Sequence, residues 1–187
     1  MNPCPSNHLN HHLSHHLILG GARSGKTHYA EQLAQQNEHT QAHSVLYLAT
    51  AQALDDAMRT RIQAHQATRP NNWKTIEEPY QLAQTLQDHD RDNQTIIVDC
   101  LTLWLTNLLC HTESKTLLPK AKQALLDSLP RLASHLIFVS NEVSLGVIPL
   151  GELNRRFVDE AGYLHQALAQ HVDHVTLMVA GLPHQIK

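Results

Sequence analysis

Cysteine, net charge and long apolar runs are all scarce in this chain, and each shortage excludes a class of protein. The three cysteines, Cys4, Cys100 and Cys110, are an odd number without C-x-x-C spacing. They exclude a disulfide framework and a zinc knuckle, and they favour a reducing, cytoplasmic compartment. With 14 basic and 17 acidic residues the net charge is -3, so we expect no nucleic-acid partner and no broad anionic-membrane surface.

The sequence also shows no apolar run typical of a membrane span or a secretory signal. The most apolar window, residues 95–110, is too short to span a bilayer and contains Asp99. The N-terminus lacks a basic segment followed by a long apolar run, so we expect no secretory signal.

Length and composition indicate one compact domain. The 187 residues, of which 42% are hydrophobic, can build a single good core. We assign the domain to residues 17–187 and interpret residues 1–16 as a poorly ordered, His-rich leader. Clustered imidazoles can bind Zn, Ni or Cu, but the whole chain contains 16 histidines, so the cluster reflects composition more than a metal site.

The strongest motif is Gly-Gly-Ala-Arg-Ser-Gly-Lys-Thr at Gly20 to Thr27, which fits G-x-x-x-x-G-K-[ST] and follows the apolar run Leu17 to Leu19. A strand, a glycine loop and a helix start in this order form a concave set of backbone N–H donors for phosphate oxygens. Lys26 is expected to reach the β and γ phosphates, and the Thr27 hydroxyl to help hold Mg²⁺. The motif therefore predicts a nucleotide site.

Strands and helices alternate after this loop. Apolar runs predict strands at 17–19, 45–49, 73–76, 95–98 and 136–139, with a last strand from 172 or 174 to 179. Helical spacing predicts helices at 27–36, 55–68 with Asp55 as N-cap, 80–87, 101–110, 115–135 and 152–170. Pro119 and Pro130 must start, break or kink the helix at 115–135. Repeated β-α units with apolar strands predict an α/β fold of the P-loop NTPase type, with a mostly parallel sheet and helices on both faces.

Two further residues carry candidate chemistry. Asp99 follows four apolar strand residues, and an acid at a strand's carboxyl end beside a phosphate loop supports Mg²⁺. His65 lies on a helical face with Met58 and Ile62, where histidine is more often structural. An imidazole nitrogen in the right place could nevertheless attack an α-phosphate and hold the nucleotide as a phosphoramidate.

A series of shorter marks follows the phosphate loop along the chain: Leu46 to Gln52, Asp55-Asp56 with Met58, Arg61-Ile62, His65, Arg69-Pro70, Trp73, Val98 to Thr102, Asn107 to Leu109, Ser140 to Val143, Gly146, Pro149, Arg156-Phe157, Asp159, Gly162, Gln166 and Gly181 to Lys187. Through the phosphate loop and these marks, the chain from Leu17 to Lys187 resembles the bifunctional adenosylcobinamide kinase and adenosylcobinamide-phosphate guanylyltransferase family of cobalamin biosynthesis.

The resemblance implies two reactions. A nucleoside triphosphate, ATP or GTP, phosphorylates adenosylcobinamide, and GTP guanylylates the enzyme's own histidine before the GMP passes to adenosylcobinamide phosphate. The matching histidine is His65, with Lys26 as the second catalytic position. The matching nucleotide contacts are Leu19, Gly20, Gly21, Ala22, Arg23, Ser24, Gly25, Lys26, Thr27, Ala49, Thr50, Ala51, Gln66, Ala67, Thr68, Arg69, Glu77 and Asp99. Mg²⁺ is expected at Thr27 and Asp99, and a homo-oligomer, a trimer in the family, is implied.

Some positions depart from the family pattern. Asp99 stands where some relatives have Glu, Ser144 where many have Gly, and His165 where Asn is usual. The leader is outside the pattern. None of these departures removes a proposed catalytic residue, but Ser144 and His165 affect the shape of the corrinoid side of the site.

Two alternatives from other classes remain open. A metallochaperone GTPase would use the His-rich leader to store nickel, although its N-K-x-D motif is absent, since Asn141-Glu142 does not supply it. A simple small-molecule kinase would use the phosphate loop alone, with His65 as a structural helix residue.

Overall fold

A seven-stranded sheet forms the centre of the molecule. The computed structural model describes residues 14–53, 55–67 and 69–187, and at positions 57, 61 and 65 it describes the backbone alone. The strand order is β3-β2-β4-β5-β1-β6-β7, and the six strands from β3 to β6 run parallel while β7 is antiparallel to β6. The strands are β1 (His16–Gly20), β2 (Ser44–Ala49), β3 (Lys74–Glu77), β4 (Gln94–Asp99), β5 (His135–Asn141), β6 (His174–Val179) and β7 (Leu182–Gln185).

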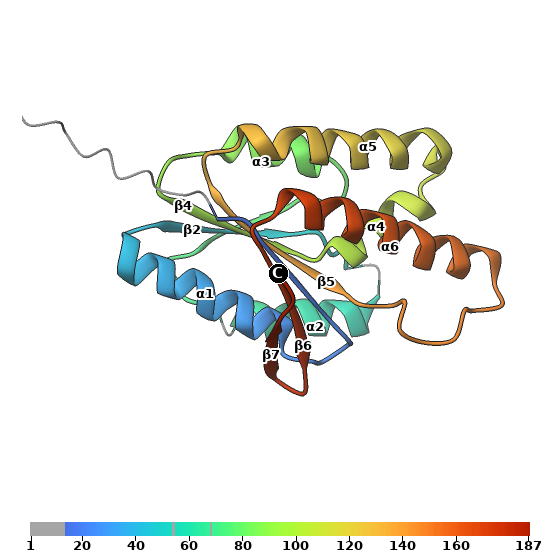
Figure 1. The fold of residues 1–187 in the computed structure, drawn as a ribbon, viewed down its shortest axis with the longest axis horizontal. Coiled ribbons are helices and arrows are strands. Elements are labelled where there is room, and N and C mark those ends of the chain that lie inside the picture. The colour runs from blue at the N-terminus through green and yellow to red at the C-terminus, as the bar shows by residue number, and fades with distance from the viewer. Residues whose placement is uncertain (1–13, 54, 68) are drawn as a thin grey trace, which may run out of the picture.

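Helices cover both faces of the sheet, as Figure 1 shows. On one side lie α1 (Lys26–Gln41), which contacts β1, β2, β4 and β5, and α2 (Asp56–Ala67). On the other side lie α3 (Leu82–His89), α4 (Leu101–Cys110), α5 (Ser114–Ser128) and α6 (Glu152–His171). The α/β fold with a mostly parallel sheet is therefore confirmed.

Each strand of the central sheet contributes to two cores because successive side chains point to opposite faces. Leu17 belongs to the core that also contains residues of α3 to α6, whereas its neighbour Ile18 belongs to the core that contains Ala30 and Ala34 of α1. Ile96 and Ile97 divide in the same way, and both are fully buried. Burial on both faces explains why these strands read as continuous apolar runs.

Most predicted elements are confirmed, and the 101–110 helix has the expected limits. Asp55 caps α2 as predicted, since its Oδ1 accepts a 2.6 Å hydrogen bond from the Met58 N–H. The predicted helix at 115–135 is too long, and it neither starts nor ends at Pro119, which lies inside α5. It ends at Ser128 and gives way to a 3-10 turn at Leu129–Arg131, where Pro130 cannot donate the hydrogen bond that would continue it.

The two ends of the domain differ from the prediction. Strand β1 begins at His16, so the last residue of the predicted leader belongs to the sheet, and residues 1–13 lie outside the described part of the chain. Strand β7 was not predicted, because all four of its side chains are exposed and give no apolar pattern. The positive φ angles of Ala180 and Gly181 form the tight connection to β6.

Within residues 14–53, 55–67 and 69–187, no helix combines the length and apolar character that crossing a bilayer requires.

Candidate active site

The phosphate loop lies between the carboxyl end of β1 and the start of α1. Its backbone is tied to both neighbouring connections: the Glu142 N–H donates to the Gly20 carbonyl at 2.9 Å, and the Gly181 N–H donates to the Ser24 carbonyl at 3.0 Å. These bonds fix the loop against the segments that follow β5 and β6. The loop that is predicted to bind phosphate is therefore braced by two backbone hydrogen bonds.

Gly20 is required by space as well as by backbone angle. Its φ is +153°, and a Cβ added there would lie 2.5 Å from the Met178 carbonyl oxygen and 2.6 Å from Ser24 Oγ. Gly21, the next residue, has nothing within 4 Å of an added Cβ. The strand can turn into the loop beside β6 only because position 20 has no side chain.

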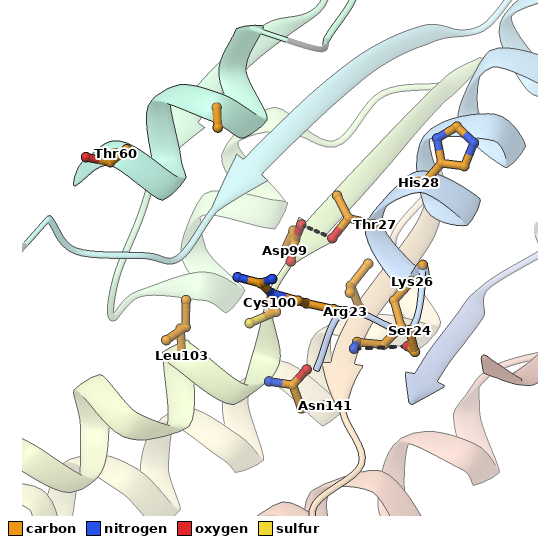
Figure 2. Close-up of a pocket in the computed structure, with 13 residues that line it drawn as sticks. Arg23, Ser24, Lys26, Thr27, His28, Thr60, Asp99, Cys100, Leu103 and Asn141 are labelled. Atoms are coloured by element: carbon orange, nitrogen blue, oxygen red, sulfur yellow. Dashed lines mark hydrogen bonds between the residues drawn. The ribbon is translucent and has the colours of Figure 1, made fainter. Parts of the chain in front are cut away.

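The two polar side chains that follow the glycines point in different directions: Figure 2 shows Lys26 beside Ser24 of the loop and Thr27 directed to Asp99. Lys26 is buried, and its Nζ donates to the Gly21 carbonyl at 2.6 Å. Thr27 Oγ1 donates to Asp99 Oδ2 at 2.9 Å. Lys26 thus holds its charge within the cradle, and Thr27 joins the loop to the end of β4.

Three predicted site residues share one row at the carboxyl edge of the sheet. Ala49 ends β2 and pairs in register with Glu77 of β3 on one side and Asp99 of β4 on the other. Thr50 comes next and is fully buried, with its Oγ1 donating to the Cys100 carbonyl and accepting from the Cys100 N–H. Thr50 therefore joins the ends of β2 and β4 through backbone bonds.

A pair of oxygen ligands at this edge fits Mg²⁺. Thr27 Oγ1 and Asp99 Oδ2 lie within hydrogen-bond distance of each other beside the phosphate loop. Magnesium prefers oxygen ligands and keeps several waters, so one carboxylate, one hydroxyl and the phosphates of a nucleotide are a suitable set. No cluster of three or more His, Cys, Asp or Glu that could hold a metal occurs in the part of the chain that the structure describes.

Arg69 lies across the face of an aromatic ring behind Asp99. The Arg69 Cζ is 3.4 Å from the centroid of Tyr47, whose hydroxyl donates to Asp99 Oδ2 at 2.5 Å. Burial, followed by the charge of Asp99, raises the pKa of Tyr47, so the phenol remains a donor. Arg69 Nε and Nη1 are buried and have no hydrogen-bond partner among the described residues.

Glu31 is the acidic neighbour of this group. It follows Thr27 by one turn of α1, and it is 8% exposed. Burial is the main cause that raises its pKa, while the nearby Arg69 lowers it. Sequence reasoning missed both Glu31 and Tyr47; the one signal for Glu31 was its position four residues after Thr27, on the same face of the helix.

A cavity of about 660 Å³ opens in front of the phosphate loop. Its lining joins the loop and Asp99 to α2, through Thr60 and Ala64, and to Cys100, Leu103, Val139 and Asn141. Burial, followed by the charge of Asp99, raises the pKa of Cys100 to about 11, so this thiol stays protonated at neutral pH. Asn141 was not among the predicted contacts, although, like Asp99, it is a polar residue ending an apolar strand.

His65 follows Ala64 directly in α2, so its backbone belongs to the helix segment that borders the cavity. Gln66 and Ala67 are exposed at the end of this helix, Thr68 lies outside the described residues, and Ala51 is half-buried after β2. The roles assigned to these positions stay predictions.

Asn141 is held by a buried chain of hydroxyl and imidazole groups. Its N–H donates to Thr102 Oγ1 at 2.6 Å, and Ser140 Oγ lies 3.2 Å from Thr102 Oγ1 and 2.8 Å from His165 Nε2. Burial lowers the pKa of His165. His165, one of the departures noted above, thereby links α6 to the cavity wall through β5.

Comparison with known proteins agrees with this arrangement. Residues 16–186 match the family model described as "Cobinamide kinase / cobinamide phosphate guanyltransferase". The chain is similar to the bifunctional adenosylcobalamin biosynthesis protein CobP of Pseudomonas aeruginosa, with 52% identity over 171 residues, covering 91% of this chain and 96% of the relative. It is also similar to the proteins named CobU of Salmonella typhimurium and Escherichia coli, at 35% and 33% identity, each covering 91% of this chain and 98% of the relative. The chain belongs to the cobinamide kinase / cobinamide phosphate guanyltransferase family.

Proposed function

We propose that this chain phosphorylates adenosylcobinamide with a nucleoside triphosphate and, separately, transfers GMP from GTP to adenosylcobinamide phosphate through a covalent bond to His65. The observation that carries the proposal is the cavity shared by the phosphate loop and α2. One wall, the phosphate loop at the start of α1, supplies groups that can bind phosphate. The other wall belongs to α2, the helix that carries the candidate nucleophile His65. The name of the family describes both reactions.

In the kinase reaction the hydroxyl oxygen of the corrinoid side chain attacks the γ-phosphorus. A new O–P bond forms, the bond from the γ-phosphorus to the bridging oxygen breaks, and the nucleoside diphosphate leaves with the electron pair while the hydroxyl proton is lost. The backbone cradle from Gly20 to Gly25 binds the phosphates, and Lys26 opposes their charge. Nucleotide binding requires Lys26 Nζ to exchange its contact with the Gly21 carbonyl for phosphate oxygens.

In the guanylyl transfer a neutral ring nitrogen of His65 attacks the α-phosphorus of GTP. The N–P bond forms, the bond to the bridging oxygen breaks, and pyrophosphate leaves with the electron pair. A phosphate oxygen of adenosylcobinamide phosphate then attacks the same phosphorus, so that the N–P bond breaks and adenosylcobinamide-GDP is released. Arg69 suits charge developing on the α-phosphate because a guanidinium can bind two phosphate oxygens at once.

Thr27 and Asp99 would hold Mg²⁺, which when bound neutralises phosphate charge. The hydrogen bond from Thr27 to Asp99 keeps these two oxygen ligands beside each other. Glu77 and the backbone of Ala49 to Ala51 would contact the nucleotide at the neighbouring strand ends. We further propose a cytoplasmic location and a homo-oligomer, with the corrinoid entering where the cavity opens.

Incubation of the enzyme with adenosylcobinamide and GTP tests this function, with products separated by chromatography. We expect adenosylcobinamide phosphate first and adenosylcobinamide-GDP after it, the second requiring His65 and both requiring Lys26. A His65→Ala variant should still make the first product. A wild-type enzyme that makes only the first product would reduce the chain to a simple kinase, and one that makes neither would contradict the proposal.

A further inference from the structure

Tyr47 occupies a place between two parts of the site that perform different tasks. It is 1% exposed and lies in the middle of β2, where its hydroxyl requires a hydrogen-bond partner. Its ring face lies 3.4 Å from Arg69 Cζ, and its hydroxyl donates to Asp99 Oδ2 at 2.5 Å. One side chain therefore contacts both the cationic group and the carboxylate of the site.

The contacts of Asp99 show what the hydroxyl does. Asp99 Oδ2 accepts from Thr27 Oγ1 on one side and from Tyr47 on the other. Two donors on one oxygen fix the direction of the carboxylate and leave Oδ1 for other partners. A hydrogen bond to a charged group is about twice as strong as one between neutral groups, so the loss of the Tyr47 donor should loosen Asp99 appreciably.

The contacts of Arg69 show what the ring does. The guanidinium has buried Nε and Nη1 donors that meet no acceptor among the described residues, which is unfavourable unless a ligand supplies one. Stacking on an aromatic face orients a guanidinium without using its N–H groups. Tyr47 thus positions Arg69 and leaves its donors available to phosphate oxygens.

We propose that Tyr47 is a positioning residue that orients two groups of the active site at once: its hydroxyl holds the magnesium-binding carboxylate of Asp99, and its ring holds Arg69 for the α-phosphate of GTP. This rests on the proposed function. The two tasks belong to different atoms of one side chain, so they are separable by substitution. Tyr47→Phe removes the hydroxyl alone, whereas Tyr47→Leu removes the hydroxyl and the ring.

The test measures binding of a fluorescent GTP analogue, first in EDTA and then over a Mg²⁺ titration, for wild type, Tyr47→Phe, Tyr47→Leu and the control Tyr29→Phe. Tyr29 is a half-buried residue of α1 whose ring meets that of His16 edge to face. We expect Tyr47→Phe to match wild type in EDTA and to need about tenfold more Mg²⁺ for half-maximal enhancement, from the loss of one charge-assisted hydrogen bond. Tyr47→Leu should in addition bind the analogue about fivefold more weakly in EDTA, from the loss of the stacked ring.

Formation of the GMP adduct at saturating Mg²⁺ gives the second readout. Tyr47→Phe should form it at the wild-type rate, and Tyr47→Leu should form it more slowly. Thermal unfolding identifies a variant that fails to fold, and in that case Tyr47→Phe alone decides. The proposal would be overturned if Tyr47→Phe needed the same Mg²⁺ concentration as wild type for half-maximal enhancement. It would also be overturned if Tyr47→Phe lost as much binding in EDTA as Tyr47→Leu. If wild type itself forms no adduct, the proposed guanylyl transfer fails, while the binding measurements still decide the role of Tyr47.

Discussion

Gly20 offers the sharpest structural perturbation of the phosphate loop. In Gly20→Ala the new Cβ would meet the Met178 carbonyl oxygen at 2.5 Å and Ser24 Oγ at 2.6 Å, and the Met178 oxygen belongs to the backbone of β6, which cannot rotate away. Overpacking of this kind costs about 1–3 kcal/mol. A φ of +153° adds about 1–3 kcal/mol for a residue with a Cβ, so we expect a loss of roughly 2–6 kcal/mol in the free energy of unfolding.

Thermal unfolding without nucleotide measures this loss. For a chain of this size each kcal/mol lowers the midpoint by about 2–4 °C, so Gly20→Ala should melt roughly 4–24 °C below wild type. Because the loop would shift, nucleotide binding should weaken in the fraction that remains folded. The control is Gly21→Ala, where a Cβ meets nothing within 4 Å, so its unfolding midpoint should stay near that of wild type. Equal midpoints for the two variants would refute the close approach of β1 to β6 on which the loop geometry depends.

Three further predictions concern charge, pH and the leader. Lys26→Ala should lower the rates of both reactions about 100-fold or more, since one preorganised charged donor at the phosphates is lost; wild-type rates would contradict the assignment of the loop. Burial, with the neighbouring His174, lowers the pKa of His16 from 6.5 to about 4. Between these pH values the unfolded chain binds a proton at His16 that the folded chain does not bind, so the free energy of unfolding should fall as the pH drops from 6.5 toward 4. Denaturant unfolding over this range should show a shallower decline in His16→Gln, and an unchanged slope would exclude this contribution. Removal of residues 1–13, which precede the family match, should leave both rates at full-chain values, and a large loss would assign the leader a role in the reaction.

The central sheet could be predicted because its sequence signals are local. Buried parallel strands such as β4 appear as continuous apolar runs, and Asp99 and Lys26 follow from the order of strand, loop and helix. The edge strand β7 could not be predicted, because its four side chains are exposed and its pairing with β6 depends on a turn rather than on an apolar pattern.

The site residues that sequence reasoning missed are those whose role depends on distant contacts. Tyr47 is an aromatic residue in an apolar strand, and only the pairing of β2 with β4 brings its hydroxyl to Asp99, 52 positions later. The link from His165 to Asn141 likewise requires α6 to pack against β5. Spacing along the chain contains no signal for such pairs, because they are created by the sheet order.

Covalent guanylylation of His65 is the claim on which the bifunctional account depends most, and a single-turnover experiment with α-labelled GTP tests it directly. After rapid mixing, acid-sensitive label should remain on the wild-type protein, pyrophosphate should be released in equal amount, and peptide mapping should place the GMP on His65. The adduct should be absent in His65→Ala while that variant still phosphorylates adenosylcobinamide. Label retained by His65→Ala, or pyrophosphate release without any protein-bound GMP in wild type, would contradict the account.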